Sequence, residues 1–413
     1  MSFLSAARAV SKRPAGQMTA LAVVCGLFAV WGLALWLYNA LFGQFTDFFA
    51  LQPVQAAWTL SLFNISYFVL AIPAALFHRQ FGYKIGFLLG LSIFALGAFL
   101  LYLAIIQHSG ACFLGAVIMM GLCGASLDTS LNPLAVEAGS PQTSVVRLNF
   151  ANAFNGLGLV AGCLIARSLI EAHYKLTVGA PAQLSARPYV LIGLGAILLA
   201  YVIEQMSLPA FATDRASKSA SIREDLQPLL GDRNIWFASA SLCAYFVVLT
   251  IIWSSNPHYS GTELPGHAVG LIEKGFIWFA IGRCVGSVFM CWVDPIRLLR
   301  WCIGLSFIAI AMASALGGMY GWVCLISASL FLSITFPTIF GTAICGLGTR
   351  TKLAAGILAT AAGIGNALAP LFVVPAMSAL NVRVVILSAL PFLAIILGYA
   401  LASRSGHKQA CTN

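Results

Sequence analysis

Apolar stretches of about 20 residues recur along almost the whole chain, and they constrain the fold more than any other feature of the sequence. A helix of that length crosses a hydrocarbon core roughly 30 Å thick. Of the 413 residues, 60% are hydrophobic and 8% are charged, whereas about 25% of the residues in an ordinary soluble domain are charged. A water-soluble fold could not bury so much apolar surface. The sequence therefore predicts a multi-pass membrane protein.

The apolar stretches are continuous and do not alternate with polar residues, which favours helices over the strands of a closed barrel. We therefore expect an all-α membrane protein with twelve transmembrane helices. Breaks at Gly, Pro and charged residues place these helices at residues 18–41, 55–77, 83–106, 111–136, 147–171, 188–207, 234–256, 267–292, 298–317, 319–345, 353–377 and 382–403.

The basic residues between these helices are distributed unequally between the two sides of the membrane. Sixteen lie on one side: Arg8, Lys12, Arg13, Arg79, Lys84, Arg147, Arg215, Lys218, Arg223, Arg233, Arg297, Arg300, Arg350, Lys352, Arg404 and Lys408. The other side has only Lys175, Arg187 and Arg383. Because Lys and Arg accumulate in cytoplasmic loops, the pattern predicts an inner (cytoplasmic) membrane protein with both termini in the cytoplasm.

One long polar stretch divides the chain. It separates an N-terminal six-helix bundle (residues 1–207) from a C-terminal one (residues 234–413), and residues 208–233 are predicted to form a cytoplasmic linker. Transporters of the major facilitator type have two such bundles, with the solute site between them near the middle of the membrane.

Five segments carry a more specific resemblance. They are YFVLAIPAALFHRQFG (67–82), LDTSLNP (127–133), RLNFANAFNG (147–156), the pair Gly282-Arg283, and FPTIFGTAICGLG (336–348). With these segments in this order, the chain resembles the fucose:proton symporter family of the major facilitator superfamily. The resemblance implies a monomeric uptake system with an intramembrane acid that carries the coupling proton, and with polar side chains that hydrogen-bond the solute.

The resemblance assigns roles to particular residues. Asp128 matches the acid of the family's L-E-T-x-x-N-P motif and is the predicted proton carrier, while Asn155 and Asn152 match polar family positions and are predicted to bind the solute. Asn39, also a predicted solute ligand, begins a pair that reads N-D in the family, and its partner here is Ala40. Leu249 stands where the family has a glutamine, so polarity that faces the sugar is lost at two positions.

The intramembrane position of Asp128 supports a functional role independently. An ionised carboxylate inside a helix of the membrane costs roughly 2.5–3.5 kcal/mol on insertion scales, and such residues mark proton relays and ion pathways. The alternative is a permanent structural ion pair with Arg147 or Arg283. We interpret both arginines as gating or ion-pair residues.

Three further charged residues lie in predicted helices. Arg167 is in the outer part of the fifth helix, where it could contact the solute or extend to the lipid headgroups. Glu273 and Lys274 are adjacent and point about 100° apart, so at least one should face the interior. Lys274 would suit a solute carboxylate, and Glu273 could replace the acid missing at Ala40 as a second proton site. A solvated vestibule is the alternative for both.

The loop after the second helix also departs from the superfamily pattern. It normally carries G-x-x-x-D-R, but here the segment FHRQFGYK (77–84) has no aspartate, and His78-Arg79 stand near its place. The charge latch that this motif normally provides must therefore be altered.

Together these features predict proton-coupled uptake of a small polar solute. The added cations and lost polar positions favour a sugar acid or another carboxylate, including a carboxylate siderophore, over a neutral sugar such as fucose, glucose or galactose. We expect no enzyme activity, cofactor or metal site, because catalytic clusters and a P-loop are missing from the sequence. The scattered basic residues predict no nucleic-acid partner. A channel or a membrane-embedded enzyme would be the alternative outside this class.

Overall fold

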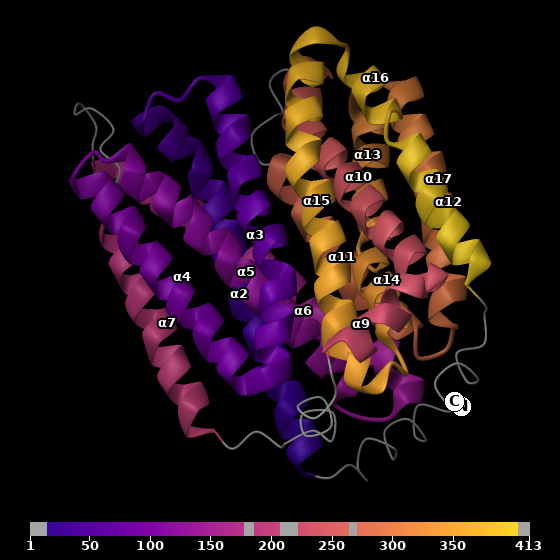
Figure 1. The fold of residues 1–413 in the computed structure, drawn as a ribbon. Helices are drawn as coiled ribbons and strands as arrows, with labels where there is room; N and C mark the ends of the chain where they lie inside the picture. The colour runs from indigo at the N-terminus through magenta and orange to yellow at the C-terminus, as the bar shows by residue number, and fades with distance from the viewer. Residues whose placement is uncertain (1–14, 177–185, 207–221, 264–270, 404–413) are drawn as a thin grey trace.

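The computed structural model describes residues 15–176, 186–206, 222–263 and 271–403. A few side chains inside helices are also outside the description, among them those of Asn39, Arg167 and Glu273. Figure 1 shows the helices of the described ranges standing side by side in two groups. We call the helices from α2 (Ala15–Phe48) to α7 (Arg187–Gln205) the N-terminal half, and those from α10 (Arg233–Glu263) to α17 (Leu390–Ala402) the C-terminal half.

The N-terminal half contains α2 (Ala15–Phe48), α3 (Pro53–Phe81), α4 (Tyr83–Ile106), α5 (Gly110–Glu137), the short 3-10 helix η1 (Pro141–Thr143), α6 (Ser144–Leu176) and α7 (Arg187–Gln205). Helix α9 (Ile222–Gly231) falls within the predicted linker. The C-terminal half contains α10 (Arg233–Glu263), α11 (Leu271–Phe289), α12 (Pro295–Leu316), α13 (Gly318–Leu332), α14 (Thr335–Ile344), the 3-10 helix η2 (Gly348–Arg350), α15 (Thr351–Ala379), α16 (Val382–Leu387) and α17 (Leu390–Ala402).

Each of the twelve predicted spans has a counterpart among these helices. In the described residues, eleven stretches are long and apolar enough to cross a membrane, and α11, with 19 residues, lies at the remaining predicted span, the eighth. The tenth span is divided into α13 and α14, and the last into α16 and α17. The first span was predicted too short, since α2 continues to Phe48.

Local chemistry sets several helix ends. Gly82 turns the chain from α3 into α4 with a φ of 87°, and Gly317 does the same between α12 and α13 with a φ of 68°. Both angles fall in the left-handed region, where a side chain is disfavoured. At the start of α12, the carboxylate of Asp294 accepts hydrogen bonds from the backbone N–H groups of Ile296 and Arg297. It satisfies donors that the helix itself leaves unpaired.

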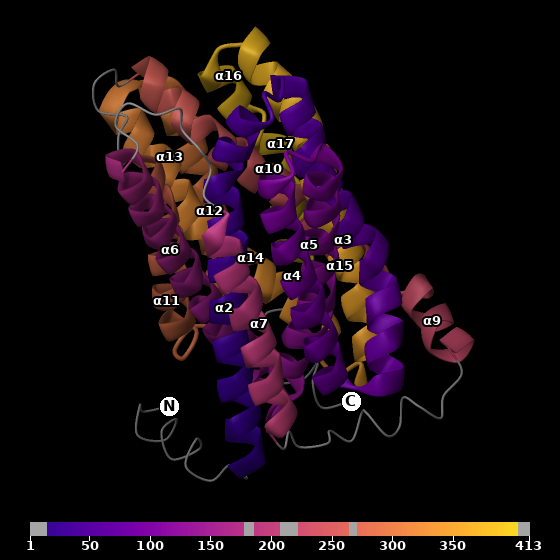
Figure 2. The same ribbon diagram turned by 90° about the vertical axis from the view of Figure 1, so that its left-hand side faces the viewer.

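The two halves meet along two seams. Helix α3 packs against α15, and α6 packs against α11 and α14 (Figures 1 and 2). Small residues allow the close approach: a Cβ atom on Gly356 of α15 would press on Ala75 of α3, and one on Gly363 would press on Phe68. The seams therefore bring intramembrane polar residues of the two halves within contact distance.

Basic side chains gather at one end of the helices. We define this basic face by residues at the end of α3, at the starts of α4 and α6, and at the starts of α10, α12 and α15. They are Arg79, Lys84, Arg147, Arg233, Arg297, Arg300, Arg350 and Lys352. Helix α9 lies at the same end (Figure 2).

Candidate functional site

Asp128 of α5 is half-buried and is held by a neutral donor from another helix. The hydroxyl group of Tyr67 on α3 donates a hydrogen bond of 2.9 Å to its Oδ2 atom. In the described part of the chain, Asp128 forms no ion pair. The guanidinium of Arg283 is near enough to attract it without contact.

Arg283 of α11 connects the two halves inside the membrane. Its buried guanidinium donates to Asn155 Oδ1 at 2.8 Å and to the backbone oxygen of Asn152 at 3.2 Å, both on α6. It also donates at 3.2 Å to the backbone oxygen of Ser333, in the break between α13 and α14. The broken tenth span thus supplies an acceptor for a buried cation, which an unbroken helix would use for its own hydrogen bonds.

Two asparagines link Asp128 to Arg283. Asn132 donates from its side chain to the backbone oxygen of Asp128 at 2.9 Å, and Asn152 donates to Asn132 Oδ1 at 3.4 Å. We call the series Asp128, Asn132, Asn152 and Arg283 the polar chain. It runs from α5 through α6 to α11, and so brings together the predicted proton carrier, one predicted solute ligand and one predicted gating residue. Asn155, a second predicted ligand, adjoins it through Arg283 and donates to the backbone oxygen of Phe28 at 3.3 Å.

A second polar contact joins the halves along the other seam. Asn366 of α15 donates to Asn64 Oδ1 of α3 at 2.8 Å, and Thr250 of α10 donates to Asn366 Oδ1 at 3.4 Å. The sequence analysis did not single out this trio for solute binding. The sequence alone could have indicated the two asparagines, because carboxamides inside apolar helices usually face a hydrogen-bonding partner or a solute pathway.

Arg147 makes its contacts in a different part of the N-terminal half, between the end of α5 and the start of α6. Its guanidinium donates to the backbone oxygens of Ala135 and Ser140 and to the hydroxyl group of Thr143, at 3.1, 2.7 and 2.6 Å, and to the backbone oxygen of Val136. These bonds tie the end of α5 to the start of α6. Arg147 therefore braces the N-terminal half at the basic face and does not contact Asp128.

The remaining predicted site residues do not join the polar chain in the described structure. Lys274 is exposed near the start of α11, and its Nζ lies 5.9 Å from the centre of the Trp322 ring. The side chains of Asn39, Arg167 and Glu273 lie outside the described residues.

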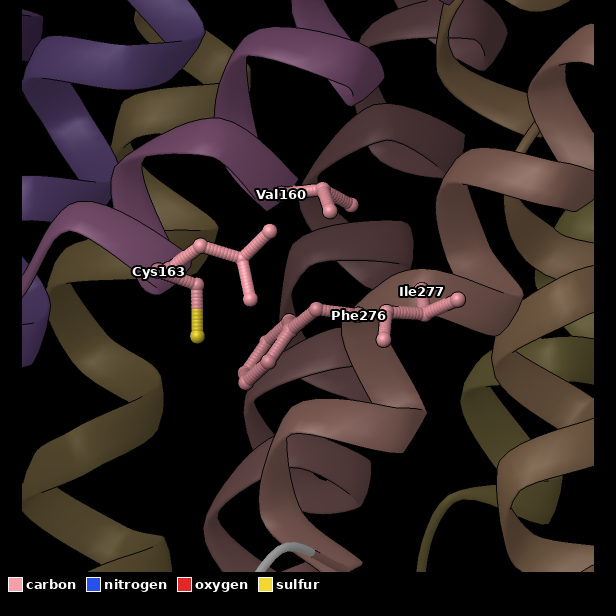
Figure 3. A pocket seen from close by; sticks show the side chains of 5 residues that line it. Val160, Cys163, Phe276 and Ile277 are labelled. Atoms are coloured by element: carbon pink, nitrogen blue, oxygen red, sulfur yellow. The ribbon is translucent and has the colours of Figure 1, made fainter. Parts of the chain in front are cut away.

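A small hollow opens between α6 and α11, and Figure 3 shows its lining. Four apolar side chains and one thiol form it: Val160, Cys163, Leu164, Phe276 and Ile277. Hydroxyl groups of a polar solute would find few hydrogen-bond partners there. The hollow is therefore poorly suited to a polar solute, and the polar chain is the better candidate site.

The chain is similar in sequence and in structure to known transporters. The family model described as Major Facilitator Superfamily matches residues 19–370. The L-fucose-proton symporter of Escherichia coli K12 is 31% identical over 373 residues, which covers 84% of each chain. The glucose/galactose transporter of Brucella abortus is 29% identical over 353 residues, again 84% of each chain. The crystal structure of FucP, a major facilitator transporter in the outward conformation, aligns with a TM-score of 0.83 at 27% identity and covers 94% of this chain and 100% of its own.

These comparisons confirm the predicted fold class of an all-α membrane protein with twelve helices in two bundles, and the expectation of a transporter and not an enzyme. They show that the preference for an acidic solute is wrong, because the relatives are symporters or transporters of fucose, glucose and galactose. The preference relied on the added cations Arg167 and Lys274 and on the polarity lost at Ala40 and Leu249. Lys274 is exposed, with its Nζ atom 5.9 Å from the centre of an indole ring, and the side chain that donates a hydrogen bond to Asp128 is the neutral hydroxyl group of Tyr67.

Proposed function

We propose, from the premise that this chain belongs to the Major Facilitator Superfamily and to its fucose:proton symporter family, that it couples the inward movement of protons to the uptake of a neutral hexose or deoxyhexose. Two kinds of relative support this solute class, one named for fucose and the other for glucose and galactose. The two neutral carboxamides of the polar chain, Asn132 and Asn152, agree with it.

The observation that carries the proposal is the environment of Asp128. Its carboxylate accepts a hydrogen bond from the phenol of Tyr67, and within the described part of the chain no ion pair holds it in the charged state. An acid in such a place can gain and lose a proton without breaking an ion pair, and the cost of its charge inside the membrane links protonation to the conformation around it. Asp128 therefore carries the coupling proton.

The amides beside Asp128 bind the solute. Asn152 and Asn155 each offer a carbonyl oxygen and an NH₂ group, which match the donor and acceptor character of sugar hydroxyl groups. At present these amides bond to Asn132, Arg283 and backbone oxygens. Bound sugar would take over some of these bonds, so its arrival would loosen the contact between α6 and α11. Asn39 is the proposed third amide.

The other predicted charges have lesser parts in this proposal. Arg283 gates the site through its bonds to both halves, and Arg147 braces the basic face. Glu273 remains a proposed second proton site. Arg167 and Lys274 have no solute-binding role here, because that role depended on an acidic solute.

The proposal extends to the protein's place in the cell. The excess of Lys and Arg on the basic face supports an inner-membrane location with that face toward the cytoplasm. Both termini would then be cytoplasmic, the two bundles would be separated by the predicted linker at residues 208–233, and the protein would work as a monomer.

Uptake into proteoliposomes tests the function. The purified protein is reconstituted with an alkaline interior, and the accumulation of radiolabelled L-fucose, D-glucose, D-galactose and D-galacturonate is measured with and without the pH gradient. We expect gradient-driven accumulation of at least one neutral sugar and none of the acid. Accumulation of galacturonate alone would overturn the proposed solute class.

A pair of Asp→Asn variants tests the coupling residue in the same assay. Asp128→Asn should abolish accumulation against a gradient while exchange of labelled for unlabelled sugar continues. Asp294→Asn is the matched control, since asparagine also caps helices well and Asp294 lies at the start of α12. An Asp128→Asn protein that still accumulates sugar would sink the proton-carrier role.

A further inference from the structure

Helix α9 places a buried acid against the end of α3. Asp225 forms an ion pair of 2.6 Å between its Oδ2 atom and the guanidinium of Arg79, and the two side chains are only 6% and 4% exposed. The neighbouring acid on the same helix, Glu224, is exposed. A linker helix that only followed the membrane surface would leave Asp225 in solvent as well.

The second oxygen of Asp225 faces the C-terminal half. Its Oδ1 atom accepts a hydrogen bond of 3.2 Å from the hydroxyl group of Thr349 and lies 3.8 Å from the Nε atom of Arg350. Both residues belong to η2, the turn that leads into α15. One carboxylate is thus divided between the two halves, with Oδ2 on the N-terminal half and Oδ1 on the C-terminal half.

A second contact joins the same two places. Lys352, at the start of α15, is 1% exposed and donates a hydrogen bond of 3.3 Å to the backbone oxygen of His78 at the end of α3. Its Nζ also lies 4.4 Å from the centre of the Tyr83 ring at the start of α4. The α3–α4 turn and the start of α15 are therefore held together at the basic face.

The sequence explains why a residue from the linker is needed. The turn between α3 and α4 retains the arginine of the superfamily's G-x-x-x-D-R pattern as Arg79, but it lacks the aspartate. Asp225 lies 146 positions away in the sequence and supplies an acid to that arginine.

We propose that Asp225 is a linker latch: it replaces the missing loop acid and holds the two halves together at the basic face in the conformation described here. When the basic face opens, η2 moves away from the end of α3. The carboxylate can follow only one of them, so opening breaks part of its contacts. The latch acts on the rocking of the two halves and is independent of which solute is carried.

A simpler role would be to anchor α9 to α3. A buried ion pair is by itself weak support for a special function, because desolvation offsets much of the attraction. The two roles differ in what the contacts to Thr349 and Arg350 do. An anchor needs only Arg79, whereas a latch needs both sides of the carboxylate.

Hydrogen–deuterium exchange of the protein in lipid nanodiscs, without solute, distinguishes them. In Asp225→Asn, peptides covering the α3–α4 turn and η2 should exchange about tenfold faster. This factor corresponds to a loss of about 1.4 kcal/mol from the free energy that keeps the basic face closed. Glu224→Gln, one residue away on the same helix, is the matched control and should exchange like the unaltered protein. Asp225→Glu should restore most of the protection.

Thr349→Val isolates the latch from the anchor and leaves the Arg79 ion pair in place. We expect faster exchange at η2 with α9 unchanged. The latch is overturned if Thr349→Val and Asp225→Asn both leave η2 as protected as in the Glu224→Gln control, or if only α9 loosens in Asp225→Asn. Because no sugar is present, this result does not depend on the proposed solute.

Discussion

Asp128 and Asp225 are two acids withdrawn from solvent in one protein, and their surroundings differ. Asp128 lies within a transmembrane helix and accepts a hydrogen bond from the neutral phenol of Tyr67. Asp225 lies at the basic face and is paired with Arg79, with a second arginine close by. The comparison teaches that partners, and not burial alone, separate an acid that can exchange a proton from one that holds parts of the chain together.

The same contrast appears in the cations. Arg283 donates to amide and backbone oxygens inside the membrane, whereas Arg79 is committed to a carboxylate. Removing the partner of a charged residue at the basic face should therefore lower the stability of the protein strongly. Removing a charge near the polar chain should leave its stability nearly unchanged.

Arg79→Gln should destabilise the protein most. It leaves the carboxylate of Asp225 buried without its 2.6 Å partner, and breaking a buried pair in this way typically costs about 3–5 kcal/mol. Thermal unfolding in detergent measures the change in Tm. Arg223→Gln, which removes an exposed arginine of α9, is the control.

The double variant sharpens this result. Arg79→Gln combined with Asp225→Asn removes both charges and should recover much of the lost stability, because no uncompensated carboxylate remains. If Arg79→Gln unfolds at the same temperature as the Arg223→Gln control, the ion pair between Arg79 and Asp225 does not stabilise the protein. The distinction between Asp225 as a structural acid and Asp128 as a proton-exchanging acid would then be wrong.

Asp128→Asn and Asp225→Asn should change the Tm of the protein in opposite directions. A carboxylate inside the membrane costs roughly 2.5–3.5 kcal/mol on insertion scales, and an asparagine oxygen can still accept from Tyr67. We expect a Tm equal to or above that of the unaltered protein, even though accumulation is lost. In Asp225→Asn the Tm should fall. A large fall in both variants would mean that Asp128 is also a structural acid.

Tyr67→Phe should have a smaller effect on transport. It removes the 2.9 Å donor to Asp128, and a hydrogen bond to a charged group contributes about 1.5–3 kcal/mol. Gradient-driven uptake should slow about tenfold, since the ionised carboxylate loses a donor. Initial uptake rates measure this, with Tyr399→Phe, a buried tyrosine of α17, as the control. Equal rates in the two variants would exclude Tyr67 from the coupling mechanism.

The sequence predicted the twelve spans well because the bilayer sets both the length and the composition of each helix. It did not predict the breaks at Ser333 and Ser388, since both spans remain apolar throughout and the breaks depend on packing. It also left α9 within a polar linker. Ten residues with two acids in the first turn, Glu224 and Asp225, indicate a helix only weakly when considered alone.

For the site, the family motifs identified Asp128, Asn152, Asn155 and Arg283, and the structure brings all four into one connected region. The motifs could not show that Tyr67 is the donor to Asp128, because this contact crosses between helices far apart in the sequence. The same limit applies to Arg79 and Asp225, 146 positions apart.

Lys274→Gln should have the smallest effect and completes the comparison, because it separates an exposed cation from a buried one on the same helix. Lys274 makes a cation–π contact with Trp322 at 5.9 Å, and such contacts contribute about 0.5–1 kcal/mol at exposed sites. Neutral-sugar uptake should stay within about threefold of the unaltered rate, which corresponds to that energy. Arg283→Gln, which removes two hydrogen bonds between the halves and a third to Ser333, should abolish uptake in the same assay. Loss of sugar uptake in Lys274→Gln would instead extend the solute site along α11 to its beginning, and would remove the distinction between the polar chain and the exposed end of the helix.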